Sequence, residues 1–108
     1  MNSLERLLWW LIAGSRGGQN RARILMLLKE RPMNTHQLAK AMSVDYSTIQ
    51  HHLKVLKKNG FVGAVGGKYG ALYFLAAILE ENWDTFLKIE ERIGKNKISD
   101  EKDGGEDE

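Results

Sequence analysis

The chain contains no cysteine and a single proline. Without cysteine it can form no disulfide, no thiolate metal site and no cysteine nucleophile. We therefore expect a reducing, cytoplasmic compartment. A length of 108 residues excludes a large multidomain enzyme, while 43% hydrophobic residues are enough to bury the core of one small domain.

Long hydrophobic runs are also missing. The N-terminal apolar run covers only residues 7–13, whereas a membrane-spanning helix needs about 20 such residues. Arg6 is the only basic residue before this run, so it does not resemble a signal peptide. The segment also lacks the lysine-rich polar face of a helix that lies on a membrane surface. We therefore predict no membrane association.

Charge is distributed unevenly along the chain, although the net charge is only +2. Residues 1–79 contain eleven Lys and Arg and three acids, a net charge of +8. Residues 80–108 contain five Lys and Arg and eleven acids, a net charge of −6. This division predicts an electropositive body that meets a polyanion, followed by an acidic tail. Solvated charge without any partner is the alternative.

Two helices are predicted in the first third of the chain. Residues 4–13 form the first, which Asn2 or Ser3 can cap and Gly14 can end. Residues 20–31 form the second, because the proline that follows disfavours helix in the residue before it. The apolar positions of this second helix face the core, and its charged side chains are expected to point outward: Arg21, Arg23, Lys29 and Glu30.

Two short helices with strong start signals follow. Asn34 can cap the first, with Gln37 reaching back as in a capping box. Asp45 can cap the second. Only residues 42–44 link the two, so the pair predicts a helix-turn-helix. The second helix ends just before Gly60, which can supply the left-handed residue of a Schellman motif.

The periodicity changes after this point. Residues 61–65 and 71–75 are strand-like, and the segment between them contains three glycines, which favours a β-hairpin. Residues 76–93 then predict one long helix with apolar positions at three- and four-residue steps. The predicted fold class is mainly α with a small β-hairpin (α+β).

The predicted domain organisation is simple. Residues 1–93 form one domain with a helix at each end. Residues 94–108 are rich in acids and contain almost nothing apolar, so we expect them to be an acidic disordered tail.

The second helix of the pair has two chemically different faces. At 100° per residue, one side collects residues suited to the core: Ile49, His52, Leu53 and Leu56. The opposite side collects polar and cationic residues: Ser47, His51, Lys54 and Lys58, flanked by Thr48 and Gln50. Short polar side chains reach base edges and lysines neutralise phosphates, so this face is suited to the DNA major groove. The alternative is the solvated face of an ordinary core helix.

Residues 38–62 resemble the helix-turn-helix of winged-helix regulators of the ArsR and MarR type. The resemblance is carried by Ser47-Thr48-Ile49, by HLKVL from His52 to Leu56 and by NGFV from Asn59 to Val62. The helix from Arg23 to Leu28 and the hairpin from Gly67 to Leu75 also fit, so the resemblance covers about residues 19–79. It implies a winged helix-turn-helix with extra N- and C-terminal helices. Members bind operator DNA as dimers, read it with the second helix and place the wing on the minor groove or the backbone.

The resemblance also implies roles for individual residues. The base-facing set is Tyr46, Ser47, Thr48, Gln50 and His51. The phosphate-facing set is Lys54, Lys57, Lys58 and, in the wing, Lys68. His51 stands where an arginine is frequent, which removes a bidentate contact to guanine at that position.

Metal binding and other cofactors are not expected. The ArsR metal sensors place cysteines in the first helix of the pair, where this chain has Thr35, His36 and Gln37. The adjacent His51 and His52 point about 100° apart on a helix and cannot chelate one ion together. We therefore predict no metal site.

The terminal helices are expected to mediate assembly. Trp9 and Trp10 differ by about 100° around a helix, so one neighbour cannot bury both. Exposed patches of this size favour a homodimer through both terminal helices. The predicted interface residues are Leu7, Trp9, Trp10, Trp83, Phe86, Leu87 and Ile89. Alternatively, both helices complete the core of a single chain.

The patterns and the resemblance together predict a sequence-specific, double-stranded DNA-binding transcriptional regulator. Repression is the favoured direction, and the sequence leaves activation open. We do not expect an enzyme, because the chain has neither a Ser-His-acid arrangement nor a Gly-Lys-Ser/Thr phosphate loop. Two alternatives stay open. One is a winged-helix protein-protein interaction module of a larger assembly. The other is a repressor with a small-molecule pocket at the dimer interface, whose ligand the sequence does not identify.

Overall fold

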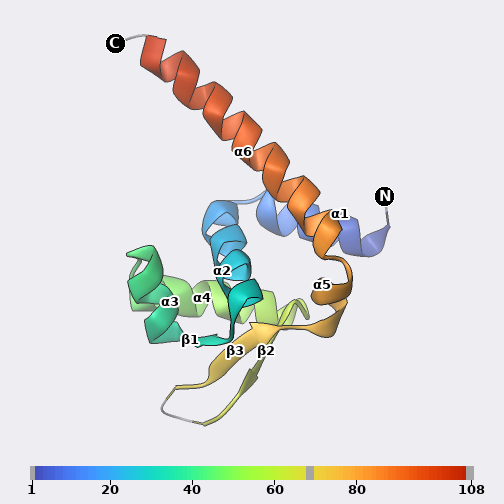
Figure 1. The fold of residues 1–108 in the computed structure, drawn as a ribbon, viewed down its shortest axis with the longest axis vertical. Coiled ribbons are helices and arrows are strands. Elements are labelled where there is room, and N and C mark those ends of the chain that lie inside the picture. Colours follow the sequence, from blue (N-terminus) through green and yellow to red (C-terminus); the bar gives the residue numbers. More distant parts are fainter. Residues whose placement is uncertain (1, 68–69, 107–108) are drawn as a thin grey trace.

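Figure 1 shows a computed structural model of the chain. It describes the backbone of residues 2–67 and 70–106, and the side chains of residues 2–67 and 70–94. Along the chain the elements are α1 (Ser3–Ile12), α2 (Gly18–Glu30), β1 (Met33–Asn34), α3 (Thr35–Met42), α4 (Tyr46–Lys58), β2 (Val62–Val65), β3 (Leu72–Leu75), α5 (Ala77–Glu81) and α6 (Trp83–Glu106).

Helix α2 is the centre of the body. It packs against α1, α3, α4 and β3. The hairpin of β2 and β3 projects at one end of the molecule, and α6 extends away at the other (Figure 1). The sheet is antiparallel with strand order β1-β3-β2. The predicted fold class, a mainly helical winged helix-turn-helix, is confirmed.

The local signals for helix ends are largely confirmed. The side chain of Asn2 accepts a hydrogen bond from the backbone N–H of Glu5, at 2.8 Å. Asn34 and Gln37 form the predicted capping box, with reciprocal bonds of 2.8 and 2.9 Å. Asp45 does occupy the N-cap position of α4, but its side chain makes no capping hydrogen bond.

Helix α4 ends in the predicted Schellman motif. Gly60 adopts a φ of 79°, which glycine tolerates better than any other residue. The backbone N–H of Gly60 donates to the carbonyl of Lys57, and that of Phe61 donates to the carbonyl of Leu56. Phe61 and Leu56 are both buried, so the motif sends the chain directly from α4 into the core and the wing.

Helix α2 begins two residues earlier than predicted. Gly17 has a φ of 81°, and α2 starts at Gly18. A Cβ atom added at Gly18 would lie 1.9 Å from the carbonyl oxygen of Ile12, at the end of α1. Two glycines therefore allow the backbone to reverse and let α2 start in direct contact with α1. The sequence predicted this segment only as a loop.

Two further predictions need correction. The predicted hairpin gains a third strand, because Met33 pairs with Tyr73 and Asn34 pairs with Leu72. A two-residue strand has too little pattern to be recognised in a sequence. The predicted single helix over residues 76–93 is divided into α5 and α6 at Asn82. The side-chain amide of Asn82 donates to the carbonyl of Ile78, which ends α5 locally.

The terminal helices help to complete the core. Leu8, Leu11 and Ile12 of α1 are buried, as are Phe86 and Ile89 of α6. Helix α1 packs directly against α6. The backbone of α6 continues to Glu106, but side chains after Gly94 lie outside the described residues, so the disordered acidic tail over 94–108 stays a prediction.

Candidate nucleic-acid interface

Helix α4 has the two faces that its sequence predicts. Ile49, Leu53 and Leu56 are fully buried, which anchors the helix in the core. Most of the predicted base-facing side chains are exposed on the other side: Tyr46, Ser47, Gln50 and His51, with Thr48 half-buried. The structure therefore brings these residues together on one accessible face of α4.

Helix α3 and the turn after it hold α4 in place. Ser43 ends α3 in the left-handed conformation, with a φ of 54°. The backbone N–H of Val44 donates to the carbonyl of Ala39 at 3.1 Å, which closes the turn. Helices α3 and α4 pack against each other. A tight connection between packed helices fixes the direction in which α4 presents its exposed face.

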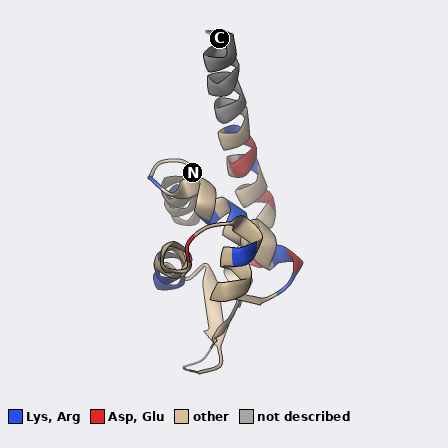
Figure 2. Ribbon diagram, turned by 90° about the vertical axis from the view of Figure 1, so that its left-hand side faces the viewer, with Lys and Arg blue, Asp and Glu red and all other residues tan. Residues whose placement is uncertain are grey.

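The same face is electropositive. Lys54, Lys57 and Lys58 are exposed, and Asp45 is the only acid between residues 35 and 58. Among the described residues, none of these lysines forms an ion pair. Figure 2 shows Lys and Arg over the helices of the body, and both acidic and basic positions along the described part of α6. The lysines of α4 are therefore available for phosphate contacts.

One feature of this face was not predicted from the sequence. The hydroxyl of Thr35, at the start of α3, donates to Oε1 of Gln50 at 3.3 Å. Nε2 of Gln50 donates to the hydroxyl of Tyr46, also at 3.3 Å. Thr35 is only 5% exposed. The buried hydroxyl of Thr35 on α3 therefore orients the exposed side-chain amide of Gln50 on α4.

Arg21 was predicted to point outward, but it is buried and 4% exposed. Its Nε donates to the carbonyl of Leu11 at 2.9 Å, and one terminal nitrogen donates to the carbonyl of Arg16 at 2.9 Å and to the hydroxyl of Ser15. The partial negative charge at the C-terminal end of α1 thus compensates the guanidinium. Burial lowers the pKa of Arg21. Periodicity alone cannot reveal such a residue, because its partners are backbone carbonyls.

His52 connects this arginine to α4. Its Nδ1 lies 3.2 Å from the second terminal nitrogen of Arg21, which can only donate, so His52 accepts through Nδ1 and is neutral. Burial, together with the nearby charge of Arg21 and His51, lowers the pKa of His52. The ring lies so close to Gly17 that a Cβ there would be 2.6 Å from Cε1. His52, which the sequence assigns to the core side of the helix, is therefore also a link between α4 and the end of α1.

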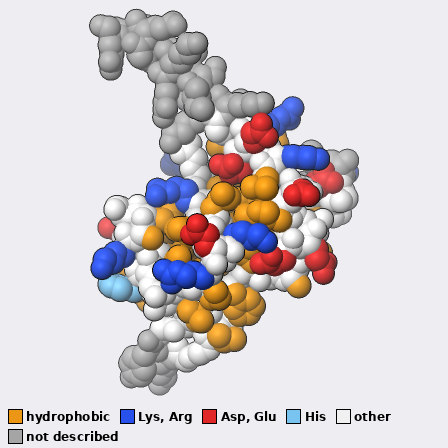
Figure 3. Space-filling view, viewed as in Figure 1, with side chains coloured by type: hydrophobic (Ala, Val, Ile, Leu, Met, Phe, Trp, Pro, Cys, Tyr) orange, Lys and Arg blue, Asp and Glu red, His pale blue; other side chains and the backbone are white. Residues whose placement is uncertain are grey.

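The described part of the wing is apolar at its surface. Val65 and Leu72 are exposed on β2 and β3. Figure 3 shows hydrophobic side chains gathered toward the wing and in the centre of the same face. The predicted phosphate contact Lys68 lies outside the described residues, so its role stays a prediction.

The predicted dimer residues differ in how much surface they can offer. Phe86 and Ile89 are buried in the core of this chain, so they offer almost no side-chain surface to a partner. Trp83 is half-buried, stacks on Phe86 at 4.5 Å and lies under the ammonium of Lys29. Trp10 is 57% exposed. The surface that remains consists of the exposed Trp10 and Leu87 with the half-buried Leu7, Trp9 and Trp83.

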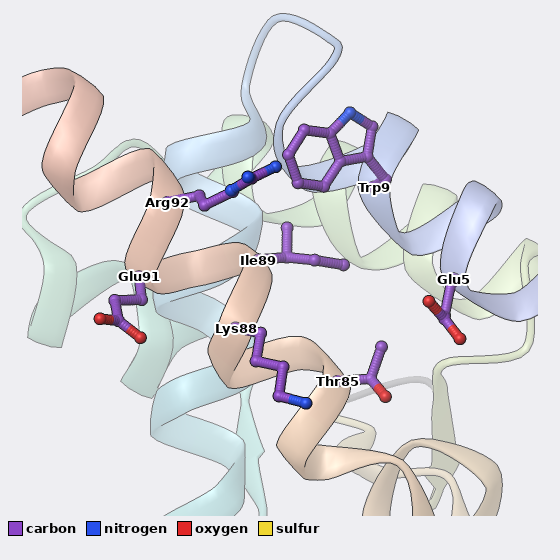
Figure 4. Close-up of a pocket in the computed structure, with 7 residues that line it drawn as sticks. All are labelled: Glu5, Trp9, Thr85, Lys88, Ile89, Glu91 and Arg92. Carbon is purple, nitrogen blue, oxygen red and sulfur yellow. The ribbon is translucent and has the colours of Figure 1, made fainter. Parts of the chain in front are cut away.

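A pocket of about 470 Å³ lies between α1 and α6, beside this surface (Figure 4). Trp9 and Ile89 form apolar parts of its wall, and the guanidinium of Arg92 lies 5.7 Å from the centre of the Trp9 ring. Glu5 and Lys88 contribute charges of opposite sign. A lining with both signs of charge does not identify a class of ligand.

Two negative findings apply to the described residues. No group of three or more His, Asp or Glu side chains among them is placed to hold a metal ion. Within that same part of the chain, no helix combines the length and apolar character needed to cross a bilayer.

Residues 18–63, which run from the start of α2 into β2, match the sequence family described as bacterial regulatory protein, arsR family. No curated protein sequence matches the chain. The predicted resemblance to ArsR-type winged helix-turn-helix regulators is therefore confirmed over the central part of the chain, and the matched proteins are regulators rather than enzymes.

Solved structures share the fold at low sequence identity. A probable transcriptional regulator from Pseudomonas aeruginosa gives a TM-score of 0.68 at 19% identity, over 91% of this chain and 76% of that one. Rv0081 from M. tuberculosis gives 0.62 at 24% identity, over 91% and 99%. The homodimeric winged helix-turn-helix DNA-binding domain of Mb0332 from Mycobacterium bovis, a possible ArsR-family regulator, gives 0.63 at 20% identity, over 84% and 80%.

Proposed function

We propose, from the match of residues 18–63 to the arsR family of bacterial regulatory proteins, that the chain is a transcriptional repressor that binds double-stranded DNA in a sequence-specific manner. It acts in the cytoplasm as a homodimer. Each protomer inserts α4 into a major groove and lays its wing on the backbone or the minor groove. The observation that carries this proposal is the exposed polar and cationic face of an anchored α4.

The chemistry of that face divides the work between two kinds of contact. Ser47, Gln50 and His51 lie on the N-terminal half of α4, where recognition helices contact bases. Lys54, Lys57 and Lys58 lie toward its C-terminal end and are free to neutralise phosphates. Phosphate contacts set register and affinity, and base contacts set sequence preference.

The homodimer is supported by two independent points. Trp10 is 57% exposed on α1 and Leu87 is exposed on α6, so a second copy seated here would cover the large apolar surface of an indole. The similar domain of Mb0332 is described as homodimeric. A two-fold dimer would place its two α4 helices in successive major grooves, about 34–36 Å apart.

Selection from a random duplex pool, followed by titration at several salt concentrations, tests the proposal. We expect enrichment of a two-fold symmetric site. Six α4 lysines in a dimer predict that log K falls against log salt with a slope of about −5. Affinity that is independent of salt, or a pool without enrichment, would contradict the proposal. Retention of a protein partner in place of DNA would favour the docking-module alternative.

A further inference from the structure

Gln50 is the one base-facing side chain that two neighbouring groups hold from two sides. Thr35 reaches it from α3, and Tyr46 reaches it from one turn earlier on α4. We propose that Gln50 is the specificity-determining residue for one adenine in each half-site, an inference that rests on the function proposed above.

The hydrogen-bonding capacity of the amide supports this assignment. A glutamine amide has two N–H donors and an oxygen with two lone pairs. The Thr35 hydroxyl uses one lone pair of Oε1, and the Tyr46 hydroxyl uses one N–H of Nε2. One donor and one lone pair are left for a ligand. Gln50 is exposed, so these two groups are accessible from outside the protein.

Adenine is the base that matches this pair. Its major-groove edge offers the N7 acceptor beside the N6 donor, and a glutamine amide binds both at once. Guanine presents two acceptors, one of which would face the remaining lone pair of Oε1. Thymine offers only an acceptor and a methyl group, and cytosine offers only a donor. Every other base therefore leaves at least one of the two groups unmatched.

Thr35 and Tyr46, which together form a clamp on Gln50, also reduce the entropic cost of the contact with adenine. A free glutamine side chain has three rotatable torsions, and fixing them opposes binding. Thr35 is buried and belongs to the first turn of α3, beside the capping box, so its hydroxyl has a fixed position. Gln50 is thereby oriented before DNA arrives, and the adenine preference depends on Thr35 and Tyr46 although neither reads that base.

Comparison of selected sites for the wild-type chain and its variants tests this inference. Wild type is expected to enrich adenine at one position of each half-site. Gln50→Ala should abolish the preference at that position alone, by roughly 5- to 150-fold, the range that a bidentate base contact provides. Gln50→Glu removes the donor and should shift the preference to cytosine, whose N4 amino group a carboxylate can accept.

Two variants test the clamp without altering Gln50. Thr35→Val keeps the shape of a β-branched side chain, and Tyr46→Phe changes only an exposed hydroxyl, so folding is preserved at least in the second. Both should weaken the adenine preference several-fold. Thr35→Val, which lies outside the base-facing set, should leave the other positions of the site unchanged. Lys54→Ala is the matched control, since it should weaken binding to all sequences alike.

The possible failures are distinguishable. A wild-type pool without any enriched site would overturn both the repressor function and this assignment. A clear symmetric site whose profile is the same for wild type and Gln50→Ala would leave the repressor function intact and overturn the role of Gln50. An adenine preference that both Thr35→Val and Tyr46→Phe retain in full would overturn the clamp.

Discussion

Helices α4 and α1 each bury one face in the same core, but they expose opposite chemistry on the other. Helix α4 presents hydroxyl, amide, imidazole and ammonium groups, whereas α1 presents the indole of Trp10. A polar, cationic surface suits a hydrated polyanion, and its binding strength depends on salt. An exposed tryptophan suits an apolar partner, and its binding strength does not depend on salt. The comparison supports the proposal of two separate interfaces, one for DNA and one for a second copy.

The two regions are nevertheless joined inside the protein. Arg21 donates to backbone carbonyls at the end of α1 and to His52 on α4. Among the described residues it has no carboxylate partner. A displacement of α1 would therefore act, through Arg21, on the hydrogen bond to His52 of α4. Substitutions in this network test how the two regions depend on each other.

Removal of the Arg21 side chain, which links α1 to α4, should have the largest effect, and this effect is on stability. Arg21→Ala leaves the carbonyl of Arg16 and the Nδ1 of His52 without their donor, and it leaves the carbonyl of Leu11 with the hydroxyl of Ser15 alone. We expect the free energy of unfolding to fall by about 3 kcal/mol, because buried polar groups that lose a partner are costly. Urea denaturation followed by circular dichroism measures the change.

The matched control is Arg23→Ala, two residues further along α2. Arg23 is exposed, so its removal should change the free energy of unfolding by less than about 0.5 kcal/mol. Equal effects of the two substitutions would show that the buried network contributes nothing specific to stability.

The second test addresses only the apolar surface around Trp10 of α1. Trp10→Ser should weaken dimerisation by about 30-fold or more, since a central tryptophan contributes about 2 kcal/mol to a typical interface. Sedimentation equilibrium at two salt concentrations measures this change, which should not depend on salt. Met26→Ser alters another exposed apolar side chain, on α2, and should leave the dimer intact. A wild-type chain that sediments as a monomer would rule out the second interface.

The third test addresses the cationic surface alone. Lys54→Ala should reduce the slope of log K against log salt by about 2 per dimer, which corresponds to one phosphate contact per protomer. Lys88→Ala removes an exposed lysine of α6 and should leave the slope unchanged. If both substitutions reduce the slope equally, DNA contacts are spread over the whole molecule and α4 has no special role.

The two regions also differ in how far the sequence predicts them. The helix-turn-helix is encoded by local signals: the capping box at Asn34, the left-handed glycine at residue 60 and the amphipathic pattern of α4. Each acts within a few residues, so each is legible in the sequence. The side chain of Asp45 fails to cap although its position is right, because a suitable residue type does not guarantee the side-chain geometry.

The terminal regions depend on distant contacts instead. Phe86 and Trp10 are both large apolar residues on helices, yet one is buried and the other is exposed. Which of them a single chain buries depends on how α1 and α6 cross, and periodicity does not specify this. Arg21 and Thr35 were missed for the same reason, since their partners lie ten and fifteen residues away on other elements.

The smallest expected effect is a change in how the free energy of unfolding depends on pH. It tests His52, the residue of α4 that accepts from Arg21. The pKa of His52 is lowered from 6.5, chiefly by burial and then by Arg21 and His51. The unfolded chain therefore binds a proton before the folded protein does, and stability that is present above about pH 6.5 is lost as the pH falls toward the lowered pKa. Protonation would also place a second cation beside Arg21 with no carboxylate of α1, α2 or α4 in contact.

His52→Asn retains an acceptor near Nδ1 but does not titrate, so its free energy of unfolding should decline less between pH 7 and pH 5 than that of the wild-type chain. His36→Asn, at an exposed position of α3, should follow the wild-type profile, and a His52→Asn profile identical to wild type would exclude His52 as the source of the acid sensitivity.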